Sequence, residues 1–151
     1  MSKKFLVAVD GSEHGSKAAD LAADLAKASD AELILLHVID ELPVTGGLGR
    51  YAQVEGVSLD ELNARYRATR SLSDAVIDEA ETRARKTGVT RVSSQVVEGD
   101  AAAAIVEQAK LANADMVFLG SHGLSDIQGL LIGSVSHKVL HQATCTCVVV
   151  R

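Results

Sequence analysis

Apolar residues along the chain fall into short continuous runs, separated by longer stretches in which apolar residues recur at helical spacing. The runs cover residues 4–9, 32–38, 92–97, 116–119 and 147–150. Continuous apolar runs of this length are typical of strands in a parallel sheet that is covered on both faces. Polar residues at 93–95 interrupt the third run, so we expect that strand at or near a sheet edge.

The stretches between the runs predict four helices, which begin near Ser16, Ser58, Gly99 and Ser134. The second is the longest: it runs from a capping box at Ser58-Leu-Asp-Glu61 to a stop signal at Gly88. Its predicted apolar face consists of Leu62, Tyr66, Thr69, Ser73, Val76, Ala80 and Ala84. Residues 39–57 contain several glycines and show no clear period, which indicates a long connection of the kind that is usually functional or mobile.

Five strands that alternate with four helices predict one α/β domain over residues 1–151. Right-handed crossovers favour a doubly wound five-stranded parallel sheet in the order 3-2-1-4-5, with helices on both faces, a Rossmann-like architecture. Ligands of such sheets bind beyond the carboxyl ends of the strands, where the strand order reverses. Here that point lies between the first and fourth strands, at the loops Asp10-Gly11-Ser12 and Gly120-Ser-His-Gly123.

The loop after the fourth strand carries several glycines and leads into a helix that starts at Ser134. A strand, a glycine loop and a helix in this order present backbone N–H groups and a positive helix end to an anion. Gly120, Gly123 and Gly133 are expected to adopt positive φ or to let a ligand approach closely. The spacing is Gly-x2-Gly-x9-Gly-Ser, which is neither the dinucleotide fingerprint nor the Walker A motif.

This spacing resembles the nucleotide-binding signature of the universal stress protein (UspA) family, in its ATP-binding branch. The resemblance extends from Val9-Asp10-Gly11-Ser12 to the ending Val148-Val149-Val150. It implies an adenine nucleotide alpha hydrolase-like fold, a stress-response module that binds ATP (or ADP or AMP), and a homodimer formed through the last strand. One departure is Thr146, where the family often has proline, and it concerns only how the last strand begins.

By this similarity, Asp10 and Val38 look like the contacts of the ribose and the adenine. From the residues alone, Asp10 is either a ribose acceptor or a helix cap, and His122 is either a phosphate contact or an exposed loop residue. The full set of candidate nucleotide-binding residues is Val9, Asp10, Val38, Gly120, His122, Gly123, Gly133, Ser134, Val135 and Ser136.

Composition narrows the class of ligand. The net charge is −5 and aromatic residues make up 3% of the chain, so neither a nucleic acid nor an anionic membrane surface is favoured as a partner. The first apolar run is too short for a signal peptide or a membrane span, and we expect a cytoplasmic protein. The last run is apolar on both faces and falls at a sheet edge, which predicts dimerisation there.

The sequence favours a binding module over an enzyme, because it has no Gly-x-Ser-x-Gly elbow and Ser121 and His122 are direct neighbours. Glu98 and Asp100 are candidates for holding Mg²⁺ or Mn²⁺ through the phosphates. Two alternatives stay open: a slow ATP-hydrolysing enzyme of the same fold, and a dimeric interaction module without nucleotide.

Two residue pairs carry weaker signals. His137 and His141 have a spacing that a metal could use, but no third ligand is evident, so we expect no metal site of the protein's own. Cys145 and Cys147 are expected to share one face of a strand as small buried side chains. Whether these two thiols are sensitive to oxidation stays open.

Overall fold

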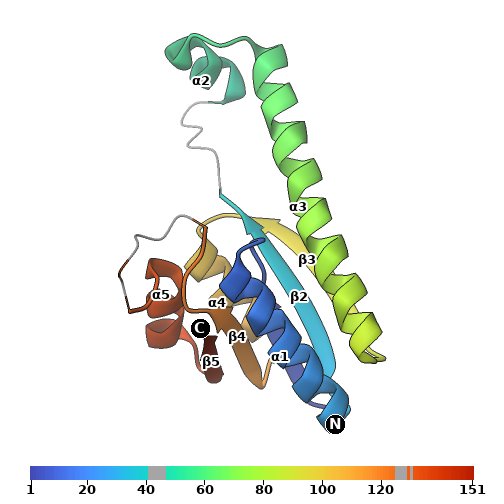
Figure 1. Cartoon of the computed structure of the whole chain (residues 1–151). Helices are drawn as coiled ribbons and strands as arrows, with labels where there is room; N and C mark the ends of the chain where they lie inside the picture. Colours follow the sequence, from blue (N-terminus) through green and yellow to red (C-terminus); the bar gives the residue numbers. More distant parts are fainter. Residues whose placement is uncertain (41–46, 125–128, 130) are drawn as a thin grey trace.

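The computed structural model describes residues 1–40, 47–124, 129 and 131–151, and Figure 1 shows its arrangement. Its elements are β1 (Lys4–Ala8), α1 (Glu13–Ser29), β2 (Glu32–Ile39), α2 (Leu48–Glu55), α3 (Leu59–Thr87), β3 (Val92–Glu98), α4 (Ala101–Ala112), β4 (Met116–Gly120), α5 (Ser134–Gln142) and β5 (Thr146–Val150).

The five strands form one parallel sheet in the order β3-β2-β1-β4-β5. This confirms the predicted doubly wound order. In the centre of the sheet, Val7 of β1 lies between Leu35 of β2 and Phe118 of β4. β1 and β4 are therefore direct neighbours, and β3 lies at one edge as its polar residues predicted.

Helices cover both faces of the sheet, and each face has its own hydrophobic core. Alternate residues of a strand enter opposite cores, so Phe5 and Val7 pack with α1 and α3, whereas Leu6 packs with α4 and α5. On α1 the residues that reach the sheet are alanines, including Ala18 and Ala22, which are fully buried. Small side chains let this helix lie close to the sheet, which matters for the site described below.

Side chains cap three of the helices. Ser12 accepts from the N–H of Gly15 and starts α1 three residues before the predicted start near Ser16. Ser58 and Glu61 form the predicted capping box of α3. Asp100 accepts from Ala103 and starts α4. These caps satisfy N–H groups that a helix leaves without intrahelical partners.

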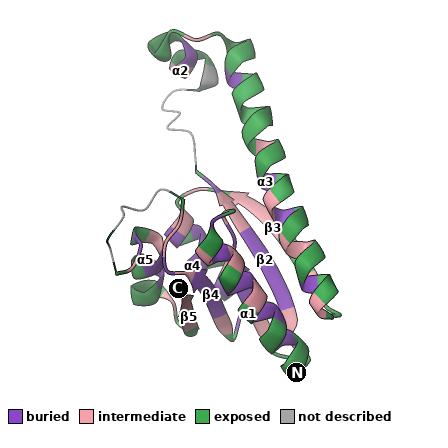
Figure 2. Ribbon diagram, in the orientation of Figure 1, coloured by how far each residue is buried: buried purple, intermediate pink, exposed green. Residues whose placement is uncertain are grey.

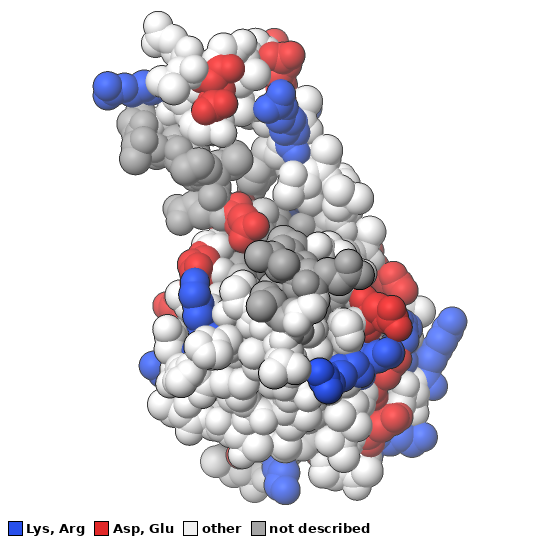
Figure 3. Space-filling model, turned by 60° about the vertical axis from the view of Figure 1, so that its left-hand side comes forward, with Lys and Arg blue, Asp and Glu red and all other residues white. Residues whose placement is uncertain are grey.

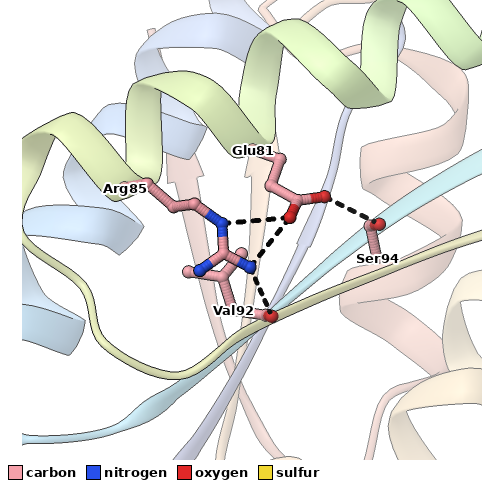
Figure 4. Close-up of polar contacts among 4 residues, drawn as sticks. All are labelled: Glu81, Arg85, Val92 and Ser94. Atoms are coloured by element: carbon pink, nitrogen blue, oxygen red, sulfur yellow. Dashed lines mark hydrogen bonds and ion pairs between the residues drawn. The ribbon is translucent and has the colours of Figure 1, made fainter.

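α3 is much longer than the strands it covers. With 29 residues it spans roughly 44 Å, about twice the length of a seven-residue strand. Its C-terminal half packs on the sheet, where Ile77 and Ala84 are buried. There Glu81 accepts from Arg85 at 2.8 Å and from the Ser94 hydroxyl of β3 at 3.2 Å (Figure 4).

The N-terminal half of α3 projects beyond the sheet and carries α2 at its tip (Figures 1 and 2). The predicted apolar face is therefore only partly buried. Leu62 is buried near α2 and Ser73 is buried near the sheet, but Tyr66 and Thr69 between them are exposed. The regular spacing of the face continues past the point where the sheet ends.

The connection after β2 is more regular than the sequence predicted. Residues 48–55 form α2, although we expected no element within 39–57. Flanking glycines concealed this helix, because Gly47 precedes it and Gly56 ends it in the left-handed conformation, at φ 67°. Residues 41–46 of the same connection lie outside the described residues.

Charged side chains of both signs are interspersed on the face shown in Figure 3, where no continuous basic area lies over the described residues. In the described part of the chain, no helix is both long and apolar enough to cross a membrane.

Candidate functional site

A cavity of about 100 Å³ opens at the carboxyl ends of β1 and β4, the predicted point of strand-order reversal. Eight of the ten candidate residues line it: Val9, Asp10, Val38, Gly120, His122, Gly123, Val135 and Ser136. The other two, Gly133 and Ser134, begin α5 beside it. The loops after β1 and β4 are more than a hundred residues apart in sequence, and the sheet brings them together.

The cavity has an apolar wall and a polar rim. Ala8, Leu36 and Leu119 come from three neighbouring strands, and Ala101 and Ile105 come from α4. The rim carries the polar groups of the two loops, Asp10, Ser12 and His122 among them.

The turn after β1 fixes the position of Asp10. Its Oδ1 accepts from the N–H of Ser12 at 2.9 Å, and the Ser12 side chain in turn caps α1. Ser12 is therefore the cap of this helix, and Asp10 is not. Asp10 is half-buried at the rim, so its carboxylate is oriented by the turn and faces the cavity.

The end of β2 contributes to the site and holds it to β1. Val38 lines the cavity. His37, the preceding residue, donates from Nδ1 to the carbonyl of Val9 at 2.7 Å; a carbonyl only accepts, so Nδ1 carries the proton. This bond ties the ends of β1 and β2 together.

Gly120 lines the cavity, and the structure adds a requirement for glycine there that the sequence did not predict. A Cβ at this position would lie 2.7 Å from the backbone nitrogen of Gly15 and 2.7 Å from the carbonyl carbon of His14. Glycine is therefore required because the first turn of α1 rests directly on the end of β4. The expectation of positive φ is wrong here: the described glycines with positive φ are Gly11, Gly47, Gly56, Gly88, Gly99 and Gly129.

The glycine loop returns to the sheet where α5 begins. The N–H of Gly133 donates to the carbonyl of Ser121, and the Ser136 hydroxyl donates to the carbonyl of Gly120 at 2.6 Å. Gly133 is the N-cap of α5, in extended conformation at φ −71°, and has no side chain that could cap the first turn. α5 thus begins without the side-chain cap that α1, α3 and α4 each have.

His122 lies half-buried at the rim, and its ring centroid is 5.5 Å from that of His14 on the first turn of α1. Sequence reasoning did not single out His14, because only the packing of α1 on Gly120 brings it to the glycine loop. His122 Nδ1 is also 3.1 Å from the Ser121 hydroxyl. Ser121 is 1% exposed, so this contact does not present a nucleophile to a substrate.

The two carboxylates considered for a divalent ion have protein partners. Glu98 accepts from the Tyr66 hydroxyl at 2.6 Å, and this bond raises the pKa of the Tyr66 phenol above its usual value. Asp100 caps α4. Within the residues that the structure describes, no three His, Cys, Asp or Glu side chains converge as a metal site requires.

The family model of the universal stress protein family, Usp, matches residues 1–151. The chain belongs to the universal stress protein family. Universal stress protein YxiE of Bacillus subtilis (strain 168) is 34% identical over 152 residues, which cover 100% of both chains. A universal stress protein of Thermus aquaticus is also 34% identical and is likewise covered completely.

A solved universal stress protein in complex with cAMP superimposes on the chain with a TM-score of 0.69 at 27% identity, over 99% of this chain and 97% of that one. The family resemblance and the fold expected from the sequence are both confirmed. Thr146, the departure from the family pattern, is the first residue of β5.

Away from the cavity, Cys145 and Cys147 pack as partly buried free thiols against the core under α4 and α5. Both contact the same core, as the spacing predicted, but they are only partly buried and Cys145 precedes β5. Burial raises the pKa of both thiols, and for Cys147 the neighbouring Cys145 raises it further.

Proposed function

We propose that this universal stress protein binds an adenine nucleotide, ATP or its di- or monophosphate, at the cavity between β1 and β4 and acts as a regulatory binding module in the stress response. The observation that carries the proposal is the meeting of the Asp10 turn and the glycine loop at one cavity with an apolar wall. A nucleotide combines an apolar base, a sugar diol and an anionic tail. The cavity offers a suitable partner for each.

The base is assigned to the apolar wall. Val38 and Leu36 of β2 provide side chains there, and the backbone at the end of β2 supplies the polar edge that a base requires. Asp10 is assigned to the ribose, because a carboxylate oriented by the Ser12 N–H can accept from sugar hydroxyls.

The phosphates are assigned to the glycine loop and the start of α5. The first-turn N–H groups of a helix carry partial positive charge and attract anions. α5 begins at a glycine, so its N-cap residue contributes no capping side chain. The cavity of about 100 Å³ is small, so the base would enter it while the phosphates lie over the rim.

The solved relative in complex with cAMP supports the ligand class, since that protein binds a nucleotide that contains adenine, ribose and phosphate. We assign a linear nucleotide because the spacing Gly-x2-Gly-x9-Gly-Ser resembles the signature of the ATP-binding branch of the family. A divalent ion would enter with the phosphates, because Glu98 and Asp100 are held by Tyr66 and by the cap of α4.

We further propose that the protein is not an enzyme. A hydrolase needs an activated nucleophile or a general base that faces the substrate, and Ser121 beside His122 is buried. A multiple-turnover phosphate-release assay tests this. Steady turnover that an Asp10→Asn variant loses would instead support the slow ATP-hydrolysing alternative.

The phosphate assignment is tested by calorimetric titration with ATP. Ser134→Ala removes one hydrogen bond to a charged group, worth about 1.5–3 kcal/mol, and should weaken binding roughly ten- to hundredfold. Gly133→Val should abolish binding, because it places a branched side chain at the buried start of α5. Lys138 is exposed, so Lys138→Ala should change little. Loss of binding in Lys138→Ala with normal binding in Gly133→Val would overturn the backbone assignment.

The cavity itself is tested with a matched pair on α4. Ala101 lines the cavity, whereas Ala103 on the same turn is exposed. Ala101→Trp should fill the space for the base and abolish binding of ATP, and Ala103→Trp should bind as the wild type does. Equal binding by both variants would move the nucleotide to another surface.

A further inference from the structure

His122 lines the cavity and meets a second histidine, His14, which the family signature does not include. His122 belongs to the glycine loop, and His14 belongs to the first turn of α1. Their ring centroids are 5.5 Å apart and the rings are tilted by 50°. Both side chains are half-buried. The packing of α1 on Gly120 fixes this distance, because His14 contributes the backbone that a Cβ at Gly120 would strike.

The charged groups around the pair come from three elements. Asp10, in the turn after β1, is held by the N–H of Ser12. Glu13 on α1 forms an ion pair with Lys17 at 3.2 Å. On α5, His137 and Lys138 are exposed. The carboxylate of Glu13 is therefore directed along α1, and Asp10 is the acid that lines the cavity together with His122.

Imidazole is the side chain whose charge changes between about pH 5 and pH 8. Two imidazoles at this separation repel one another when both are charged, and a doubly charged phosphate between or over them removes that repulsion. The start of α5, where the phosphates are assigned, is connected to the same rim through the bond from Ser136 to Gly120. His122 thus lines the same cavity as Ser136 on the first turn of α5, and His14 lies beside His122.

We propose that His14 is a further phosphate-binding side chain of this site, and that together with His122 it binds the terminal phosphate of the nucleotide with uptake of a proton. The inference rests on the proposed function. It adds a residue outside the glycine loop and makes nucleotide affinity depend on pH. Because the charged imidazole binds the phosphate, affinity is highest in mildly acidic solution and falls as the pH rises.

The test is calorimetric titration with ATP at about pH 6 and about pH 8, repeated in two buffers of different ionisation enthalpy so that proton uptake is measured directly. The wild type should take up a proton and bind more tightly at the lower pH. His14→Gln should lose most of this uptake and bind roughly tenfold more weakly at the lower pH, with little change at the higher pH. His137→Gln is the matched control, and it should behave as the wild type does.

Two further measurements separate a phosphate contact from a packing role. His14→Lys keeps a positive charge at both pH values, so it should bind ATP with an affinity that no longer depends on pH. Adenosine lacks phosphate, so its affinity should be the same in the wild type and in His14→Gln. The terminal phosphate of ATP itself titrates near about pH 6, but it does so equally for every variant, and the difference between variants isolates His14.

The outcomes are distinguishable. Equal proton uptake by the wild type and His14→Gln, with intact ATP binding, would overturn this inference and leave the proposed function standing. Failure of the wild type to bind any adenine nucleotide at either pH would overturn both. Weakened binding of adenosine by His14→Gln would show that His14 acts on packing and not on phosphate.

Discussion

The close approach of α1 to β4 gives the sharpest stability prediction. In Gly120→Ala the added Cβ would lie 2.7 Å from the Gly15 nitrogen and 2.9 Å from the His14 Cβ. Both neighbours belong to the first turn of a helix, so neither can swing aside as the tip of a long side chain would. Overpacking of this kind lowers the free energy of unfolding by about 1–3 kcal/mol. Equilibrium unfolding in urea, followed by circular dichroism, measures the loss.

Gly49→Ala is the matched control, because it makes the same chemical change inside a helix. At Gly49 an added Cβ would have no heavy atom of the described residues within 4 Å, so we expect the gain in helix propensity to dominate. This variant should be stabilised by up to about 1 kcal/mol. If Gly120→Ala unfolded at the same urea concentration as the wild type, α1 would not rest on β4 as described, and the position of His14 would lose its basis.

Two further predictions concern β5 and the thiols beside it. β5 is the edge strand beyond β4, so Val149→Asp should convert the predicted homodimer into a monomer, as measured by light scattering. The control Val54→Asp, on the exposed surface of α2, should leave the mass unchanged. A wild-type monomer at micromolar concentration would contradict the dimer. Because burial raises the pKa of Cys145 and Cys147, less thiolate is present at neutral pH. Their alkylation should be slower than that of free cysteine and should reach its plateau only at higher pH, and a rate equal to that of free cysteine would contradict the burial.

Sequence reasoning recovered the sheet and its order because four of the five strands are continuous apolar runs and the preference for right-handed crossovers leaves few strand orders. It predicted which loops meet at the cavity because strand order alone places the Asp10 turn beside the glycine loop. α2 was missed since it is only eight residues long and lies between glycines. The pattern of apolar residues over so few positions does not distinguish a short helix from a loop.

The remaining differences come from contacts between distant segments. The requirement for glycine at position 120 depends on the backbone of α1, and no feature near Gly120 in the sequence reports it. His14 reaches His122 for the same reason. The apolar face of α3 predicted burial over its whole length, but the sheet beneath it ends near Ser73. Periodicity describes one helix, and only the tertiary structure shows what lies opposite it.

The outer half of α3 also affects how the protein opens. Up to about Ser73 the helix is supported by its capping box, by contact with α2, where Leu62 and Ala52 are buried, and by the hydrogen bond from Tyr66 to Glu98 at the end of β3. Beyond Ser73 it is supported by the sheet. Segments with little buried apolar area open with a far smaller free energy than a core does. We therefore expect the outer half of this continuous helix to open more often than the half that packs on the sheet.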